Sequence, residues 1–331
     1  MKFNKPIPKE ELKKYQNLPL EDKIKLSQEI IKEFYENIDS DKVYIASSFG
    51  KDSIVLVDLV RNLYPNIPII YINTGVEHPS ILNLSKEYSN VFELKPKKPM
   101  EQIIEEYGYI TPFGKDISNT LEMARKNLYE GKFNTIRVKK LRGDVGGIGK
   151  YDYSKFAHHL LAPFKISDRC CYWLKKQPLN SFTKKNGFKY QFNGMTAEES
   201  LIRQGSMIKN GFNLEFDSRP LAHWKVHDIL SYILKYDLHL AECYGDIIEN
   251  SDGEYVTSKF YRTGCTCCPV GCDLDNPNQF QLLYKYDRET WDYVINQLGF
   301  KQVLDYFKVP YTDFENQTEE LGDVSLENWI V

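Results

Sequence analysis

The sequence contains no long hydrophobic run. No apolar stretch approaches the roughly 18 residues that a membrane-spanning helix requires, and the first residues (MKFNKP) lack the apolar core of a signal peptide. An excess of one charge is also missing, because the 331-residue chain carries a formal net charge of −3. Net charge therefore predicts neither a membrane nor a nucleic-acid partner. We expect a cytoplasmic protein that does not associate with membranes.

Cysteine is scarce, at seven residues, but six of the seven fall into two tight groups. Thiols stay reduced in the cytosol, so this grouping indicates metal or redox chemistry rather than structural disulfides. Four thiolates suit an iron–sulfur cluster or zinc, and an adjacent Cys-Cys pair is awkward for a tetrahedral zinc site. A set of inert buried thiols is the remaining alternative, and the isolated Cys243 fits it best. The two groups are Cys170 with Cys171, and Cys265, Cys267, Cys268 with Cys272.

Residues 48–53 (SFGKDS) form the most informative segment of the chain. They follow the β-branched run 43–46 (VYIA) and precede the apolar helical pattern that begins at residue 54. A strand, a small polar turn and a helix start present backbone N–H groups to an anion, and this arrangement commonly holds phosphate. Lys51 adds a positive charge. The spacing differs from the Walker pattern, and a plain surface turn is the competing interpretation.

Alternating strands and helices predict an α/β fold with a doubly wound parallel sheet. Strands are expected at residues 43–46, 67–73, 91–94 and 190–192, and a helix at 224–235. In such sheets, ligands bind beyond the carboxyl ends of the strands. The phosphate-loop candidate and the segment Asn73, Thr74, Gly75 and Glu77 would both lie at that edge.

We expect three parts along the chain. Residues 1–40 form a helical extension, residues 41–240 the nucleotide-binding α/β domain, and residues 241–331 a cysteine-rich and helical region. Residues 113–158 are less regular and contain several Lys and Arg before a glycine-rich stretch at 143–149. They are either a solvated helix and loop or a mobile flap that closes on an anionic substrate.

Several segments resemble motifs of the phosphoadenylyl-sulfate (PAPS) reductase family, in the same order. Residues 48–53 resemble its PP-loop, Ser-Gly-Gly-x-Asp-Ser, with Phe49 in place of the first glycine. Residues 170–179 (CCYWLKKQPL) resemble C-C-x-x-R-K-x-x-P-L, and residues 194–203 (GMTAEESLIR) resemble G-x-R-x-E-x-S-x-x-R. Residues 219–224 (RPLAHW) are similar to N-P-L-x-x-W. The resemblance covers about residues 40–275 and implies the adenine-nucleotide α-hydrolase-like fold.

The resemblance also implies a set of site residues. The Cys-Cys pair with a remote C-x-x-C is similar to the [4Fe–4S] signature of adenylyl-sulfate reductases, which selects four ligands and leaves Cys267 and Cys272 as substitutes. Lys51, Asp52 and Arg203 are the expected catalytic residues. The expected cluster ligands are Cys170, Cys171, Cys265 and Cys268. The expected nucleotide-binding residues are Ser47, Ser48, Phe49, Gly50, Lys51, Asp52, Ser53, Asn73, Thr74, Gly75, Glu77 and Lys175.

Two departures from the family pattern separate the functional hypotheses. The reductases use a C-terminal cysteine as nucleophile, and no cysteine follows Cys272 here. The loop also keeps Lys51, Asp52 and Ser53, an ending similar to that of ATP pyrophosphatases, including cluster-bearing enzymes of DNA phosphorothioation and tRNA thiolation. Leu174 and Thr196 replace arginines of the family motifs.

The leading hypothesis is therefore an iron–sulfur ATP pyrophosphatase that activates an acceptor for sulfur insertion, with Mg²⁺ near Asp52. The alternative is a thiol-dependent reductase of phosphoadenylyl sulfate or adenylyl sulfate, and the second alternative is a non-catalytic nucleotide-binding scaffold. The expected partners are an adenine nucleotide, a sulfur-donor protein or thioredoxin-like reductant, and a nucleic acid as one candidate acceptor. Residues 125–142 are the candidate basic surface for such an acceptor. A homo-oligomer or a subunit of a complex is expected.

Overall fold

The computed structural model describes residues 2–145 and 151–312. The strands are β1 (Val43–Ala46), β2 (Ile69–Ile72), β3 (Val91–Leu94), β4 (Tyr190–Asn193), β5 (Asp217–Ser218), β6 (Ile247–Glu249) and β7 (Tyr255–Thr257). The helices are α1 (Lys9–Gln16), α2 (Leu20–Glu36), α3 (Lys51–Leu63), α4 (Pro79–Ser85), α5 (Met100–Tyr107), α6 (Lys115–Tyr129), α7 (Ile136–Arg142), α8 (Arg169–Cys171), α9 (Gln177–Asn186), α10 (Leu201–Asn210), α11 (Val226–Lys235), α12 (Gln279–Tyr286), α13 (Arg288–Asp292) and α14 (Phe300–Phe307).

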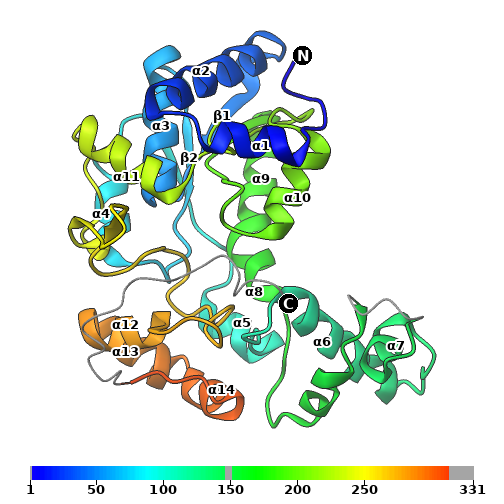
Figure 1. Ribbon diagram of the computed structural model, residues 1–331. Coiled ribbons are helices and arrows are strands. Elements are labelled where there is room, and N and C mark those ends of the chain that lie inside the picture. Colours follow the sequence, from blue (N-terminus) through cyan, green and yellow to red (C-terminus); the bar gives the residue numbers. More distant parts are fainter. Residues whose placement is uncertain (1, 146–150, 313–331) are drawn as a thin grey trace.

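Five parallel strands form the central sheet in the order β3-β2-β1-β4-β5. Helices cover both faces, with α2, α3 and α11 on one side and α9 on the other (Figure 1). Met207 of α10 is buried instead in a small core with Leu12 of α1 and Ile30 of α2. The predicted α/β class with a parallel sheet is confirmed. The strand order reverses direction between β1 and β4, and ligands of doubly wound sheets bind at such a point. The loops after these two strands, at residues 47–50 and 194–200, are therefore the expected walls of a site.

The sheet face beneath α2, α3 and α11 carries the first hydrophobic core. Val43 and Ile45 of β1 are buried there with Phe192 of β4. The ring of Phe34 packs edge-on against Phe192, with ring centroids 5.3 Å apart. The apolar spacing of the N-terminal segment thus produces a helix that seals the sheet, as the sequence predicts.

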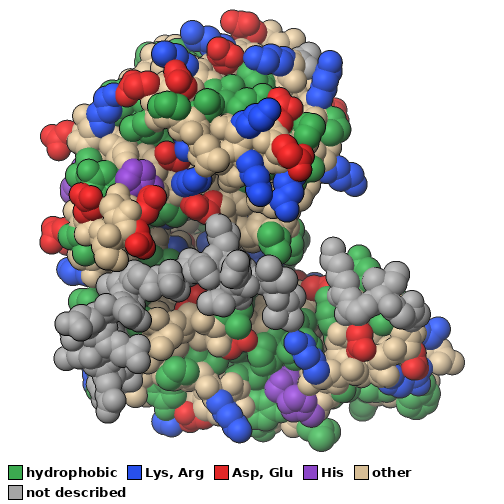
Figure 2. Space-filling view, viewed as in Figure 1, with side chains coloured by type: hydrophobic (Ala, Val, Ile, Leu, Met, Phe, Trp, Pro, Cys, Tyr) green, Lys and Arg blue, Asp and Glu red, His purple; other side chains and the backbone are tan. Residues whose placement is uncertain are grey.

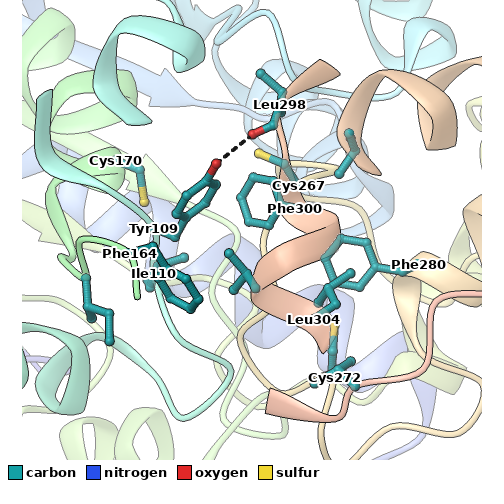
Figure 3. Close-up of a cluster of buried hydrophobic side chains, with 14 of the residues drawn as sticks. Tyr109, Ile110, Phe164, Cys170, Cys267, Cys272, Phe280, Leu298, Phe300 and Leu304 are labelled. Atoms are coloured by element: carbon teal, nitrogen blue, oxygen red, sulfur yellow. Dashed lines mark hydrogen bonds between the residues drawn. The ribbon is translucent and has the colours of Figure 1, made fainter. Parts of the chain in front are cut away.

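A second hydrophobic core lies beyond the sheet and joins distant parts of the chain. It combines residues 100–174 with the C-terminal helices α12 and α14. Tyr109 donates a hydrogen bond to the carbonyl of Leu298 at 3.0 Å, and its ring packs against Phe300 (Figure 3). The three-part division at residues 40 and 240 remains a prediction.

The stretch expected to be a flap or a solvated helix contains the helices α6 and α7. Leu121, Ala124, Val138 and Leu141 are buried in the second core. The Arg125 side chain donates hydrogen bonds to four backbone carbonyls between residues 159 and 164, at 2.7–3.1 Å. Arg125 therefore fixes the chain rather than facing a substrate. Residues 146–150 of the glycine-rich stretch lie outside the described residues.

Within residues 2–145 and 151–312, no helix is both long enough and apolar enough to cross a bilayer.

Candidate functional site

The loop between β1 and α3 is held in shape by its own serines. The Ser47 hydroxyl accepts the amide hydrogen of Phe49 at 3.1 Å. The Ser53 hydroxyl accepts the amide hydrogen of Ser48 at 3.3 Å and lies 3.1 Å from the Ser48 hydroxyl. These contacts curl the backbone around the N-terminus of α3, where N–H groups and the helix dipole favour an anion.

Phe49 occupies a backbone conformation that normally favours glycine. Its φ is 53°, in the left-handed region, and a bulky residue there is strained. The side chain is fully buried, and its ring packs against Tyr71 and Tyr88 with centroids 5.2 and 5.1 Å away. Aromatic burial therefore stabilises a turn that glycine makes in the related PP-loop motif, and Phe49 is a structural member of the loop.

Tyr244 and Thr263 fasten the start of α3. The amide of Lys51 donates to the Tyr244 hydroxyl at 3.0 Å, and that hydroxyl lies 2.8 Å from the Thr263 hydroxyl. A methyl group added at Gly50 would come within 3.0 Å of both hydroxyl oxygens. Gly50 is thus required for close approach, and the helix N-terminus is tied to the segment just before Cys265.

Lys51 and Asp52 form an ion pair at the first turn of α3. The Lys51 ammonium lies 3.1 Å from a carboxylate oxygen of Asp52, and the Lys51 side chain is only 7% exposed. Burial lowers the pKa of Lys51, but the charges of Asp52 and other neighbours more than offset this and raise the pKa above its ordinary value. Lys51 is therefore a fixed positive charge.

Arg203, the third expected catalytic residue, lies within electrostatic reach of this pair. Burial lowers the pKa of Arg203, whereas the charge of Asp52 raises it. Its guanidinium pairs with Glu199, and its amide donates to the Ser200 hydroxyl at the start of α10. Lys51, Asp52 and Arg203 thus belong to one charged group.

The loop after β2 forms a second polar wall. The Glu77 carboxylate accepts from the Thr74 amide at 2.8 Å and from the Thr74 hydroxyl at 2.6 Å. Asn73 accepts the Gly75 amide at 3.1 Å, and Gly75 has a φ of 80°. Burial raises the pKa of Glu77, although the Thr74 hydrogen bonds and Lys175 oppose that shift.

A cavity of about 290 Å³ opens between these two loops. One side is apolar, because Ala46 of β1, Ile70 and Ile72 of β2 and Leu179 of α9 line it. Serine hydroxyls, a carboxylate, an ammonium group and the segment at Thr263 line the remainder. An apolar slot with a few convergent polar groups is typical of sites that bind a small molecule or cofactor. The polar lining residues are Ser47, Ser48, Ser53, Glu77, Lys175 and Thr263.

Lys175 lies between this cavity and the cysteines. It belongs to a π-helical turn, Tyr172–Lys176, and such turns are frequent at functional sites. Negative charge at Cys265 raises the pKa of Lys175, and Glu77 and Cys171 add to the effect against burial. One ammonium group therefore serves both the cavity and the thiol cluster.

The structure brings the two cysteine groups together. A hydrogen bond between Cys170 and Cys171 raises the pKa of Cys170 and lowers that of Cys171 to about 6. Burial raises the pKa of Cys265 and Cys268, and the charge of Cys171 contributes to both shifts. All seven cysteines are free thiols.

Cys171 from one segment and Cys265 and Cys268 from the other all raise the pKa of Lys175 through their charge. Together with Cys170 they offer the four thiolates that an iron–sulfur cluster takes. Across residues 2–145 and 151–312, no three His, Cys, Asp or Glu side chains already lie in a metal-holding arrangement.

Cys267 and Cys272, the proposed substitutes, are packed into the second hydrophobic core (Figure 3). Each is only 2% exposed. Burial raises the pKa of Cys267 well above its ordinary value and that of Cys272 to about 12. Cys243 stands apart beside α4, where its amide donates to the Ser80 hydroxyl.

Two further residues hold the cysteine loop in place. The Gln279 side-chain amide donates to the carbonyls of Cys265, Thr266 and Cys268, at 2.7–3.4 Å. The Thr266 amide donates to the carbonyl of Val76 at 2.7 Å. These bonds attach the C-x-x-C turn to α12 on one side and to the loop after β2 on the other.

The structure thus places five of the expected nucleotide-binding residues in the cavity lining. The others belong to the same two loops. Phe49 and Gly50 shape the turn, Lys51 and Asp52 form the adjacent ion pair, Thr74 donates to the Glu77 carboxylate, and Asn73 accepts from the Gly75 amide. Tyr244, Thr263 and Gln279 are site residues that the sequence did not predict. Only Thr263 had a signal, since it lies two residues before Cys265 in the segment YRTGC. The five lining residues are Ser47, Ser48, Ser53, Glu77 and Lys175.

Known proteins share parts of this chain. A protein of Methanocaldococcus jannaschii described only as uncharacterized is 23% identical over 283 residues, which is 84% of this chain and 54% of that protein. The chain therefore spans about half of that relative. The adenosine 5'-phosphosulfate reductase of Staphylococcus saprophyticus is 21% identical over 234 residues, or 69% of this chain and 75% of that enzyme.

A crystal structure of a PAPS reductase from Candida auris superposes with a TM-score of 0.39 and 14% identity, over 71% of this chain and 90% of that one. Residues 42–110 and 147–271 match the family model for the phosphoadenosine phosphosulfate reductase domain. These two segments make up more than half of the chain and contain the phosphate loop, the Cys-Cys pair and the C-x-x-C turn. The chain belongs to the phosphoadenosine phosphosulfate reductase domain family.

Proposed function

We propose that this protein is an ATP pyrophosphatase that adenylates an acceptor so that sulfur can be inserted. The observation that carries the proposal is the charged start of α3, where buried Lys51 pairs with Asp52 beside the serine-lined cavity. This arrangement suits a pyrophosphate leaving group, which develops negative charge as it departs.

ATP would enter with its base in the apolar slot and its phosphates toward the loop. Ala46, Ile70 and Leu179 offer the flat apolar contact that a purine requires. The hydroxyls of Ser48 and Ser53 and the N-terminus of α3 offer hydrogen-bond donors to phosphate oxygens. Asp52 is the expected carboxylate for Mg²⁺, which usually binds through one or two carboxylates and the substrate phosphates.

The reaction would be a displacement at the α-phosphorus. An acceptor oxygen forms a bond to that phosphorus, the bond to the β-phosphate oxygen breaks, and pyrophosphate leaves. Lys51 would neutralise charge on the leaving group, and Arg203 would orient the phosphates from the opposite loop, since a guanidinium binds two oxygens at once. A sulfide equivalent from a donor protein then attacks the activated acceptor, and AMP leaves with the acceptor oxygen.

Cys170, Cys171, Cys265 and Cys268 are the residues that would hold a [4Fe–4S] cluster, which supplies iron at which sulfide can bind. Lys175 lines the cavity, and the charge of the cysteines acts on it. Its ammonium group would therefore balance the negative charge of the thiolates and contact the nucleotide at the same time. We expect this chemistry to take place in the cytoplasm, within a homo-oligomer or a larger complex.

Reduction of adenylyl sulfate or phosphoadenylyl sulfate is the second candidate. The similarity to the Staphylococcus saprophyticus enzyme, named as an adenosine 5'-phosphosulfate reductase, favours it. Lys175 and Arg203 would then bind the sulfonate and phosphate oxygens, and an external thiol or Cys243 would attack sulfur. That attack would expel AMP from adenylyl sulfate and leave the sulfonate on the thiol. A second thiol would then release sulfite, with a disulfide formed between the two thiols.

Product analysis of anaerobically purified protein separates the two candidates. Metal analysis comes first, followed by parallel incubations with ATP and Mg²⁺, where water takes the place of the acceptor, and with each sulfonucleotide plus thioredoxin. Pyrophosphate from ATP without sulfite from either sulfonucleotide is the expected result. Sulfite release without pyrophosphate would replace the proposal with the reductase.

A further inference from the structure

Positive charge is concentrated in one continuous part of the sequence. Residues 111–145 and 151–197 contain sixteen Lys and Arg against six Asp and Glu, a formal net charge of +10. The whole chain carries −3, so the rest of the molecule is strongly acidic. The near-neutral net charge is therefore the sum of one basic region and an acidic remainder. A basic region of this kind is typical of a surface that binds a polyanion.

The fold keeps these residues on one side of the molecule. Figure 1 shows α9, α8 and α6 following one another down that side, with α7 beside α6. Figure 2 shows the surface hollowed between the part with α9 and α10 and the part with α6 and α7. Four exposed lysines here enter no salt bridge among the described residues: Lys126 on α6, Lys176 just before α9, and Lys184 and Lys185 near its end.

Exposed aromatic rings accompany the charge. Tyr129 at the end of α6 is 95% exposed, and Phe133 in the following turn is 58% exposed. Tyr151 and Tyr172 are 45% and 46% exposed. Exposing aromatic rings to water is unfavourable, so a group of exposed rings often marks a binding site. Rings interleaved with lysines can stack on unpaired bases while the lysines pair with phosphates.

This surface begins at the proposed reaction centre. The first half of α6 contacts the two residues that precede Cys170: Asn119 donates a hydrogen bond to Asp168 at 3.4 Å, and Glu122 pairs with Arg169 at 3.3 Å. Ten residues of α6 lead from Asn119 to Tyr129, a distance of about 15 Å at 1.5 Å per residue. A chain lying on α6 would therefore have one end at the cysteines and cavity.

The helices α6 and α7 also lie outside the match to the phosphoadenosine phosphosulfate reductase domain, which covers residues 42–110 and 147–271. The helical insertion is thus additional to the shared nucleotide-binding domain. An addition that carries exposed rings and lysines and starts at the active centre suits a substrate larger than a mononucleotide.

We propose that α6, α7 and α9 form a binding surface for a single-stranded or looped segment of nucleic acid, which we call the basic face. Its members are Lys126, Tyr129, Phe133, Lys176, Lys184 and Lys185. The proposal rests on the proposed function, because it identifies the acceptor as a nucleic acid. Phosphates pair with the lysines, and unpaired bases stack on Tyr129 and Phe133. An acidic protein could also pair with the lysines, but the exposed ring of Tyr129 favours a partner with bases that stack on it.

The test is fluorescence anisotropy of the full chain with labelled single-stranded RNA and DNA of about 20 nucleotides, a length beyond one typical binding site. Lys184→Gln/Lys185→Gln is compared with Lys13→Gln/Lys14→Gln, an exposed lysine pair on α1. Each phosphate contact on a single strand contributes about −0.7 to the log–log salt slope, so the α9 variant should lose about one unit of slope and about five-fold in affinity. The α1 variant should match the wild type.

Tyr129→Ala should weaken binding about five-fold or more through lost stacking, and Tyr129→Phe should restore it. Tighter binding of RNA than DNA, or the reverse, identifies the kind of acceptor. The inference is overturned if the wild type shows no salt-dependent binding, or if the two lysine-pair variants lose the same affinity. It is also overturned if polyglutamate binds as tightly as the oligonucleotides and Tyr129→Ala leaves that affinity unchanged. Hydrolysis of ATP to AMP and pyrophosphate, in which water replaces the acceptor, is measured separately without oligonucleotide. A failure of nucleic-acid binding therefore leaves the ATP chemistry standing, and the converse also holds.

Discussion

The hydroxyl groups of Tyr244 and Thr263 lie 2.8 Å apart and connect the phosphate loop to the cysteine segment. Tyr244 accepts the Lys51 amide at the start of α3, and Thr263 lies two residues before Cys265. The two halves of the proposed site, one for nucleotide and one for sulfur chemistry, are therefore joined by a short chain of hydrogen bonds. Lys175 provides a second connection, because it reaches both the cavity and the thiols.

Removing the Tyr244 hydroxyl should weaken this connection. Tyr244→Phe leaves the Lys51 amide and the Thr263 hydroxyl without their partner in a fully buried position. We expect a loss of about 1–2 kcal/mol in the free energy of unfolding, measured by urea titration, and weaker nucleotide binding. Tyr129→Phe, at an exposed ring, is the control and should leave unfolding unchanged. Equal stability of the two variants would show that the link is unimportant.

Gly50 should not tolerate a side chain. The methyl group of Gly50→Ala would lie within 3.0 Å of both hydroxyl oxygens, so the loop or Tyr244 must shift. We expect nucleotide affinity, measured by calorimetry, to fall at least about ten-fold, since a displacement of 1 Å in a positioning group has large effects. Gly205→Ala on α10 meets no atom within 4 Å, and it should be neutral or stabilise by up to about 1 kcal/mol. Normal affinity in Gly50→Ala would contradict the close-approach argument.

Arg125 should contribute to stability rather than to activity. Its guanidinium satisfies four backbone carbonyls between residues 159 and 164, and a lysine cannot reproduce that planar geometry. Arg125→Lys is expected to cost about 2–4 kcal/mol in unfolding free energy. The neighbouring variant Lys126→Gln, at an exposed position, should unfold like the wild type. A stable Arg125→Lys protein with impaired nucleotide binding would restore a substrate-binding role for this residue.

His223 should make the protein less stable in mild acid. Burial lowers the pKa of His223 to about 3 in the folded state, whereas an unfolded histidine titrates near 6.5. Between these values the unfolded state binds more protons, so the free energy of unfolding falls as the pH falls. A decrease of about 1 kcal/mol from pH 7.5 to 5.5 is expected from this residue alone.

Unfolding of His223→Asn at the two pH values checks this assignment. The variant should lose stability at both but show a pH difference smaller by about 1 kcal/mol. His239→Asn, at an exposed histidine, should keep the wild-type difference. An unchanged pH difference in His223→Asn would assign the acid sensitivity to other groups.

Local features of this protein could be predicted from its sequence, and long-range contacts could not. The strand, turn and helix around Lys51 follow from a short continuous pattern, and the two cysteine groups are visible as clusters. Tyr244 lies 193 residues from Lys51, and no local pattern indicates that its hydroxyl meets a helix start. The role of Arg125 was missed for the same reason, since its partners are carbonyls that carry no sequence signature. The charge separation was hidden by a balanced total.

The products formed from ATP test the central claim most directly. Anaerobic protein with its metal complement is incubated with Mg²⁺, an RNA or DNA acceptor and ATP, and the nucleotide products are resolved by phosphorus NMR. We predict AMP and pyrophosphate, with the rate in Lys51→Met reduced at least about 100-fold because a fixed charge at the leaving group is lost. ADP with inorganic phosphate, or AMP and pyrophosphate formed equally fast by Lys51→Met, would contradict the account.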